Sequence, residues 1–197
     1  RVITARLHPA GFALADSNFY SCHAAADGRV FYTLCCHNID AHARVYGFDP
    51  RTDTTFLAGD LGAVVGETGK RLIPQGKSHV PFFESEGGLF FGTHYGYFMS
   101  VRGKETPAGV PEGYGQYPGG HFLRLDLASG AFRDFGTSPE AEGLLALGMD
   151  TVRRRLYGLT WPTGLLMRLD LDSGQLRNLG PVCRRGEAGS GSSYLCL

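Results

Sequence analysis

The side chains with most potential for chemistry are histidines, tyrosines and a few charged residues in the middle of the 197-residue chain. Histidine and tyrosine can transfer protons, and aromatic rings can also bind a ligand by stacking. The residues singled out are Lys77, His79, His94, Tyr95, Tyr97, Tyr117 and His121, with Glu142 and Trp161 further along the chain. Three kinds of chemistry fit this set.

The first kind is metal binding. His79, His94 and His121 could bind a divalent metal cofactor through their imidazole nitrogens, since histidine suits zinc, manganese and iron. Their spacing matches no established ligand pattern. A metal-assisted lyase or hydrolase acting on a polysaccharide is therefore an alternative function.

The second kind is acid–base catalysis. His79, His94 or Tyr97 could act as the general base, and Lys77 could stabilise a carboxylate or enolate. Elimination on a uronic acid or a lactone would need such a pair of groups. These four residues are the candidate catalytic residues.

The third kind is ligand binding without catalysis, and it is the leading hypothesis. Tyr95, Tyr117, His121, Glu142 and Trp161 could form a platform for a saccharide or another small polar molecule. Aromatic faces stack on the C–H surfaces of sugars, and tyrosine adds a polar tip. Two readings stay open beside it: the same residues could pack between structural units, or the chain could be a protein-interaction scaffold.

A repeat explains how these residues are positioned. The segment 121–136 begins His-Phe-Leu-Arg-Leu-Asp-Leu-Ala-Ser-Gly, and the segment 165–180 begins Leu-Leu-Met-Arg-Leu-Asp-Leu-Asp-Ser-Gly. Their terminal glycines, Gly136 and Gly180, lie 44 positions apart. A looser copy ends at Gly62. A period of about 40–50 residues is typical of β-propeller blades.

Each copy predicts short strands and tight turns. Apolar segments such as 122–125 and 166–169 are expected strands, and Asp-x-x-Ser-Gly is expected to reverse the chain into the next one. Further strands are expected at 79–84 and 145–150. A helix starting near Ser138 is the weaker alternative, because Gly143 and Gly148 disfavour it.

The predicted fold is all-β: about three complete four-stranded blades plus partial blades, in one domain covering residues 1–197. The blades are expected at roughly 19–62, 77–136 and 142–180, with another starting near 192. The simplest account is a fragment of a six- to eight-bladed propeller.

The strand pattern, with Leu-Tyr-Gly-Leu-Thr at 156–160 and Asn-Leu-Gly at 178–180, resembles the propellers of the kelch, NHL and virginiamycin-B-lyase-like types. The resemblance holds only at the level of blades. No Trp-Asp blade ending is present, and the Gly87–Gly88 pair opens a strand where kelch repeats end one. The resemblance assigns no catalytic residue, because no catalytic motif of a known lyase matches this sequence residue by residue.

Strand direction predicts which face carries function. In a four-stranded blade, the loop leading into the first strand and the loop between the second and third strands open on one face. Six of the seven histidines are expected on this face. The longest such connection, residues 94–120, is expected to be functional or mobile.

Composition excludes some partners. Lys plus Arg and Asp plus Glu number 19 each, so no basic surface for nucleic acid is expected. No apolar run is long enough for a transmembrane helix. The five cysteines include no C-x-x-C pair and are expected to be small buried apolar residues.

Overall fold

The computed structural model describes residues 3–101, 104–107 and 109–182. Three four-stranded antiparallel sheets make up most of this part of the chain, so the predicted all-β class is confirmed. The strands of the first sheet are β1 (Cys22–Ala24), β2 (Val30–Leu34), β3 (Arg44–Asp49) and β4 (Thr54–Asp60). Those of the second are β5 (Phe83–Ser85), β6 (Gly88–Gly92), β9 (His121–Asp126) and β10 (Phe132–Thr137). Those of the third are β11 (Gly143–Asp150), β12 (Arg155–Trp161), β13 (Leu165–Asp170) and β14 (Leu176–Pro181).

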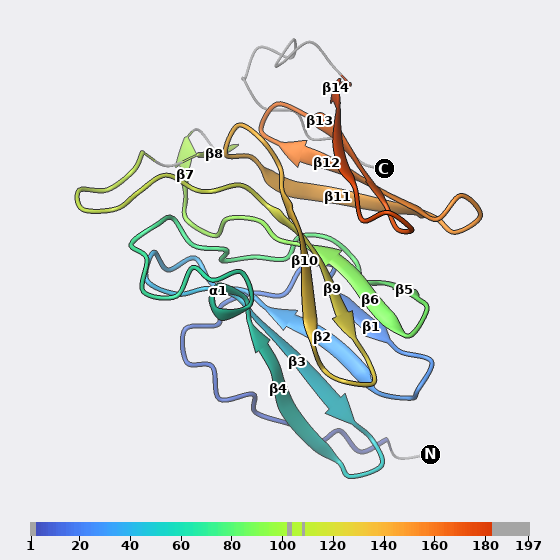
Figure 1. Ribbon diagram of the computed structural model, residues 1–197. Coiled ribbons are helices and arrows are strands. Elements are labelled where there is room, and N and C mark those ends of the chain that lie inside the picture. The colour runs from blue at the N-terminus through green and yellow to red at the C-terminus, as the bar shows by residue number, and fades with distance from the viewer. Residues whose placement is uncertain (1–2, 102–103, 108, 183–197) are drawn as a thin grey trace.

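The sheets resemble propeller blades. Within each sheet, strands that follow one another in the blade pair antiparallel, and the three sheets succeed one another along the chain (Figure 1). Within the described residues they do not close into a ring. The expected partial blade near 192 lies outside the described residues.

Several strand predictions need correction. The strand expected at 79–84 is formed only at Phe83–Ser85, and upstream of it Lys77 pairs with His94 as an isolated bridge. The long 94–120 connection contains a hairpin of β7 (Phe98–Val101) and β8 (Lys104–Pro107) that the sequence did not reveal. The segment after Ser138 forms a turn followed by β11, so the helix alternative is wrong.

One helical turn was also unexpected. The short helix α1 (Leu61–Val64) directly follows β4, and Asp60 caps it by accepting hydrogen bonds from Gly62 N and Ala63 N. No helix in the described ranges is long and apolar enough to cross a membrane.

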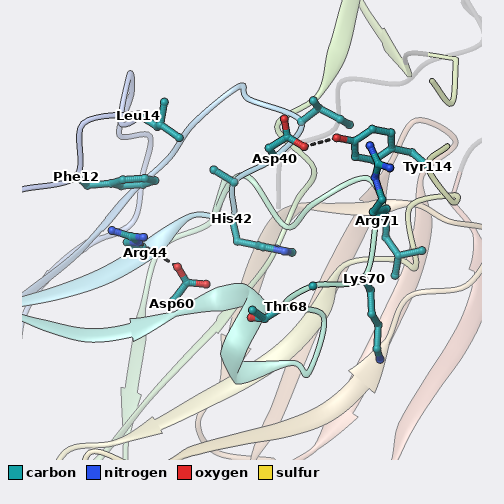
Figure 2. Close-up of a pocket in the computed structure, with 14 residues that line it drawn as sticks. Phe12, Leu14, Asp40, His42, Arg44, Asp60, Thr68, Lys70, Arg71 and Tyr114 are labelled. Atoms are coloured by element: carbon teal, nitrogen blue, oxygen red, sulfur yellow. Dashed lines mark hydrogen bonds and ion pairs between the residues drawn. The ribbon is translucent and has the colours of Figure 1, made fainter. Parts of the chain in front are cut away.

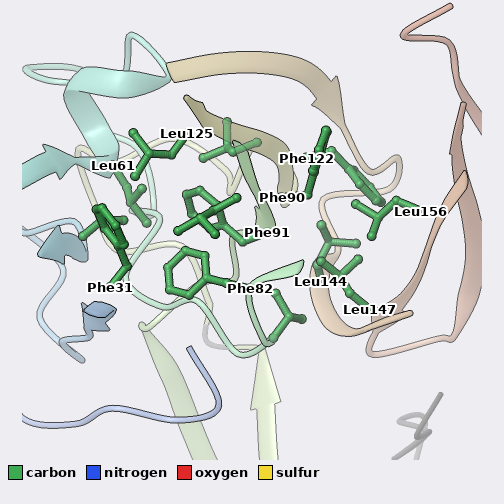
Figure 3. Packing of buried hydrophobic residues seen from close by; sticks show 14 of the residues in the cluster. Phe31, Leu61, Phe82, Phe90, Phe91, Phe122, Leu125, Leu144, Leu147 and Leu156 are labelled. Carbon is green, nitrogen blue, oxygen red and sulfur yellow. The ribbon is translucent and has the colours of Figure 1, made fainter. Parts of the chain in front are cut away.

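The core lies between the sheets. Figure 3 shows Phe82 and Phe91 packed together, with Phe122 next to Leu144 and Leu156 from the third sheet. These side chains are almost completely buried and belong to one apolar cluster that includes residues from all three sheets. Packing between sheets therefore holds the blades in their relative positions.

The Asp-x-x-Ser-Gly turns are confirmed in detail. Asp126 accepts hydrogen bonds from the backbone N–H of Ser129 at 2.9 Å and from its hydroxyl at 2.8 Å. Asp170 and Ser173 repeat these contacts at 3.0 and 2.8 Å. Gly130 and Gly174 follow with φ of 72° and 71°, a region that side chains with a Cβ rarely adopt.

Replacing Gly130 with alanine tests this turn. The Cβ would have free space, so the cost is that of a left-handed backbone alone, about 1 kcal/mol of the free energy of unfolding. Urea denaturation would measure it, with Ala128→Ser in the same turn as the control. Equal stability of the two variants would contradict the assignment.

Candidate functional site

The two predicted faces differ in the expected way. In Figure 1 the long β2–β3 connection and the segment carrying β7 and β8 lie on the left, while the β3–β4, β9–β10 and β11–β12 turns lie to the right and below. His23 is an exception to the predicted clustering, because it bonds Glu84 at 3.0 Å. The same carboxylate accepts from Ala26 N in the β1–β2 turn, so His23 lies toward the opposite face.

Several of the predicted residues line one cavity. It lies on the predicted functional face, which carries the long loops between second and third strands and is called the loop face below. The cavity has a volume of about 290 Å³, and we call it the tyrosine cavity. Tyr95, Tyr97, Tyr117 and Glu142 all line it. The remaining described lining residues, which sequence reasoning did not select, are Ile73, Val110, Gln116, Glu140, Ala141, Pro162 and Thr163.

An aromatic cluster forms the floor of this cavity. The ring centroids of Tyr95 and Tyr117 are 4.8 Å apart, and Trp161 lies 5.3 Å from Tyr95. All three side chains are at most 4% exposed. Trp161 does not line the cavity, but it packs beneath Tyr95 and is the only tryptophan of the chain.

A close approach of two backbone segments and a hydrogen bond position two of the tyrosines. Gly96 lies between Tyr95 and Tyr97, and a Cβ on Gly96 would overlap the carbonyl oxygen of Cys36 in the first sheet's β2–β3 connection. Tyr117 is held by its hydroxyl, which donates to Gln75 Oε1 at 2.6 Å. The backbone beside Tyr95 and the hydroxyl of Tyr117 are therefore held in place before any ligand enters.

Glu142 is the buried charged group of the cavity. It precedes β11 and is 2% exposed. The hydroxyl of Thr160 donates to Oε2 and that of Thr163 donates to Oε1. Just before it, Glu140 and Ala141 both have left-handed φ, at 59° and 55°, an uncommon conformation for non-glycine residues that shapes this wall.

His94 is buried under the cavity floor. Its ring stacks on Tyr95 at 4.9 Å and meets the edge of Trp161 at 5.6 Å. Burial, followed by the nearby His79 and Lys77, lowers its pKa well below the ordinary value, so the imidazole is neutral at neutral pH.

His79 and Lys77 lie beyond His94 and do not line the tyrosine cavity. His79 stacks on Phe19 at 4.5 Å and lies 5.7 Å from the His94 ring. The Lys77 ammonium is fully buried and lies over the rings of Phe19 and Phe98, at 4.9 and 4.3 Å. Lys77, His79 and His94 thus lie close together, and Tyr97 is the member of the predicted catalytic set that lines the cavity.

His121 belongs to a different cluster, which we call the His121 network. Its Nδ1 lies 2.7 Å from Asp134 Oδ2, and its Nε2 lies 3.1 Å from Glu67 Oε1. Burial acts to lower the pKa of His121, but the hydrogen bonds to Asp134 and Glu67 outweigh it and raise the pKa to about 9. His121 is therefore an imidazolium between two carboxylates.

The His121 network joins the second sheet to the connection between α1 and β5. Glu67 also accepts from Gln75 Nε2 at 3.2 Å, and Gln75 Oε1 accepts from the Thr93 hydroxyl at 2.7 Å. Thr93 in turn accepts from the backbone N–H of His121 at 2.7 Å. Both ring nitrogens of His121 thus have partners within the protein, as a packing role between units would require.

The metal hypothesis gains no support from this geometry. Both ring nitrogens of His121 face carboxylates, so His79, His94 and His121 do not form one ligand set. Among the described residues, no group of three or more His, Cys, Asp or Glu side chains is placed to hold a metal ion.

The cysteines follow the expectation in part. Cys35 and Cys36 are buried, and burial raises the pKa of the Cys35 thiol to about 11. Cys22 is exposed, contrary to the expectation. Cys183 and Cys196 lie outside the described residues.

A larger cavity, of about 360 Å³, lies beside the first sheet (Figure 2). Most of its charged groups have partners within the wall. Arg44 pairs with Asp60 at 3.0 Å and lies over Phe12, while the Tyr114 hydroxyl donates to Asp40. We therefore favour the tyrosine cavity as the functional site.

His42 points into this larger cavity in Figure 2. The backbone N–H of Gln75 donates to its Nδ1 at 3.1 Å, and burial lowers its pKa. The ring is therefore neutral with its proton on Nε2, which is a hydrogen-bond donor.

Comparison with known proteins identifies no family. No protein-family model and no curated protein matches this chain. Among solved structures, it is similar to a chain of a nidogen/laminin complex, with 11% identity and a TM-score of 0.44, over 79% of this chain and 44% of that one. It is also similar to a putative 6-phosphogluconolactonase from Bacteroides uniformis, with 14% identity and a TM-score of 0.36, over 91% of this chain and 61% of that one. The chain thus spans less than two thirds of either solved chain, and likeness at this level carries no argument about activity.

Proposed function

We propose that this chain is part of a six- to eight-bladed propeller of the kelch, NHL or virginiamycin-B-lyase-like group, and that it binds a small polar molecule or saccharide in the tyrosine cavity. The observation that carries the proposal is the cavity itself. It combines three tyrosines with the carboxylate of Glu142, the amide of Gln116 and the hydroxyl of Thr163.

This combination suits a ligand with both apolar and hydroxylated surfaces. Small-molecule sites are concave and largely apolar, with a few polar groups that fix orientation. The tyrosine rings offer stacking surfaces, while the amide, hydroxyl and carboxylate offer hydrogen bonds. A volume of about 290 Å³ fits one small molecule or one sugar unit better than a long polymer segment.

The proposal favours binding over catalysis. An anionic sugar would need a cation near its carboxylate, yet the described lining of the cavity contains no Lys, Arg or His. Lys77, the predicted stabilising group, contacts Phe19 and Phe98 instead of the cavity.

Fluorescence of the single tryptophan tests the proposal. Because Trp161 packs 5.3 Å from Tyr95, a ligand in the cavity should change its emission. We expect one or more members of a panel of mono- and disaccharides and small polyols to do so in a saturable way. Tyr97→Ala should weaken that binding about tenfold through lost stacking.

Tyr157→Ala is the matched control, since Tyr157 lies in β12 and does not line the cavity. Thermal melting of both variants would establish that they are folded. Unchanged affinity in Tyr97→Ala, or no response to any ligand, would refute the proposal.

A further inference from the structure

The tyrosine cavity contains one buried carboxylate, that of Glu142. Glu142 is 2% exposed, and both of its carboxylate oxygens accept hydrogen bonds from threonine hydroxyls. None of the ion pairs between described residues involves Glu142, and no Lys, Arg or His is among the described lining residues of the cavity. Buried carboxylates are normally paired with a positive charge, because removing them from water is costly.

The hydroxyl contacts do not neutralise this charge. The Thr160 oxygen accepts from Leu165 N at 2.9 Å, and its own proton is donated to Glu142. Thr163 donates to the other oxygen of the same carboxylate. These bonds orient the group and share its charge through dipoles, but they bring no positive charge into the site.

The tyrosine rings, like the carboxylate, favour a positively charged ligand. The face of an aromatic ring carries negative electrostatic potential and attracts cations placed within about 6 Å of its centre. Tyr95, Tyr97 and Tyr117 line one small cavity, and the centroids of Tyr95 and Tyr117 are 4.8 Å apart. Several rings around one space can enclose a cation of about the size of a methylated ammonium group.

From these observations we infer that the tyrosine cavity selects ligands that carry an ammonium group, which lies among the tyrosine rings with Glu142 as its counter-charge. The inference rests on the proposed function, since it names the class of ligand for that site. An amino sugar or a small methylated amine fits this class, whereas a uronic acid does not. Glu142 and Tyr97 become the residues that determine specificity.

The test compares two probes of nearly the same shape. Choline carries a trimethylammonium group, and 3,3-dimethyl-1-butanol replaces that group with a neutral tert-butyl group. We expect choline to bind about tenfold or more tightly than the alcohol, as measured by Trp161 fluorescence and isothermal titration calorimetry. Added salt should weaken choline binding and leave the alcohol unaffected.

Variants assign the preference to named groups. Glu142→Gln should reduce choline affinity about tenfold and change affinity for the alcohol much less, because the alcohol carries no positive charge. Tyr97→Leu removes a ring face but keeps an apolar side chain, and it should reduce choline binding selectively if Glu142→Gln is too unstable to study. Glu86→Gln is the control, because it removes a carboxylate that pairs with Arg154 in a remote turn.

The outcomes separate this inference from the proposed function. Equal affinity for the two probes would overturn the charge selectivity and leave ligand binding standing. Binding of a saccharide without any binding of choline would likewise overturn the charge selectivity and leave ligand binding standing. Loss of choline binding in Glu86→Gln to the same degree as in Glu142→Gln would show a general charge effect and would also overturn the inference.

Discussion

Replacing His121 with glutamine is expected to lower the free energy of unfolding by about 3–5 kcal/mol, since it removes one partner of a buried ion pair. The imidazolium of His121 is 6% exposed and lies between Glu67 and Asp134. Without it, two carboxylates face each other with only neutral donors nearby. Urea denaturation at neutral pH would measure the loss.

The control uses another histidine paired with a carboxylate. His23 bonds Glu84 at the same kind of distance, 3.0 Å, but its side chain is 28% exposed. Solvent screens such a pair, so His23→Gln should cost at most about 1 kcal/mol. Similar losses in the two variants would contradict a special role for the His121 network.

The His121 network also predicts a pH dependence. The pKa of His121 is about 9 in the folded protein and 6.5 as its ordinary value. A raised pKa means that the folded state holds the proton more tightly than the unfolded chain does. The resulting stabilisation is fully present below pH 6.5 and is lost as the pH rises through 9.

This prediction is checked by the difference in stability between wild type and His121→Gln. The difference should be largest at about pH 6 and should shrink as the pH rises from 6.5 through 9. Comparing the two proteins cancels other groups that titrate in the alkaline range. A constant difference across this interval would show that His121 is not protonated in the folded state.

Replacing Phe122 with alanine should have an effect of the same size, about 3–5 kcal/mol, because it creates a cavity in the core. Phe122 begins the apolar run of β9 and is completely buried. Its ring reaches into the third sheet, where its Cζ would lie 2.8 Å from a Cβ placed on Gly158. The loss therefore measures the packing between the second and third sheets.

Two further variants make this test specific. Gly158→Ala should destabilise the protein by overpacking, at about 1–3 kcal/mol, and Phe122→Leu should relieve part of that cost in the double variant. Val152→Ala is the control, since Val152 is 88% exposed and should change stability by at most about 0.5 kcal/mol. Additive losses in the double variant would contradict the contact.

The features that could be predicted from the sequence are those that depend on residues near one another in the chain. Strand alternation and Asp-x-x-Ser-Gly turns depend on residues a few positions apart, so they could be predicted. The repeat at 121–136 and 165–180 correctly placed β9 and β13 with their turns. The loop face followed from strand direction, and four of the candidate residues, Tyr95, Tyr97, Tyr117 and Glu142, line one cavity there.

The sequence by itself determined the all-β class, the turns and the face that carries the tyrosines, because these follow from local hydrogen bonding and chain direction. Only the tertiary structure decided which side chains meet. His121 contacts Glu67, 54 positions away, and Gln75 joins Thr93 and Tyr117 through a connection with no repeat signal. Such contacts depend on how one sheet packs against the next, and no spacing along a single chain encodes that packing.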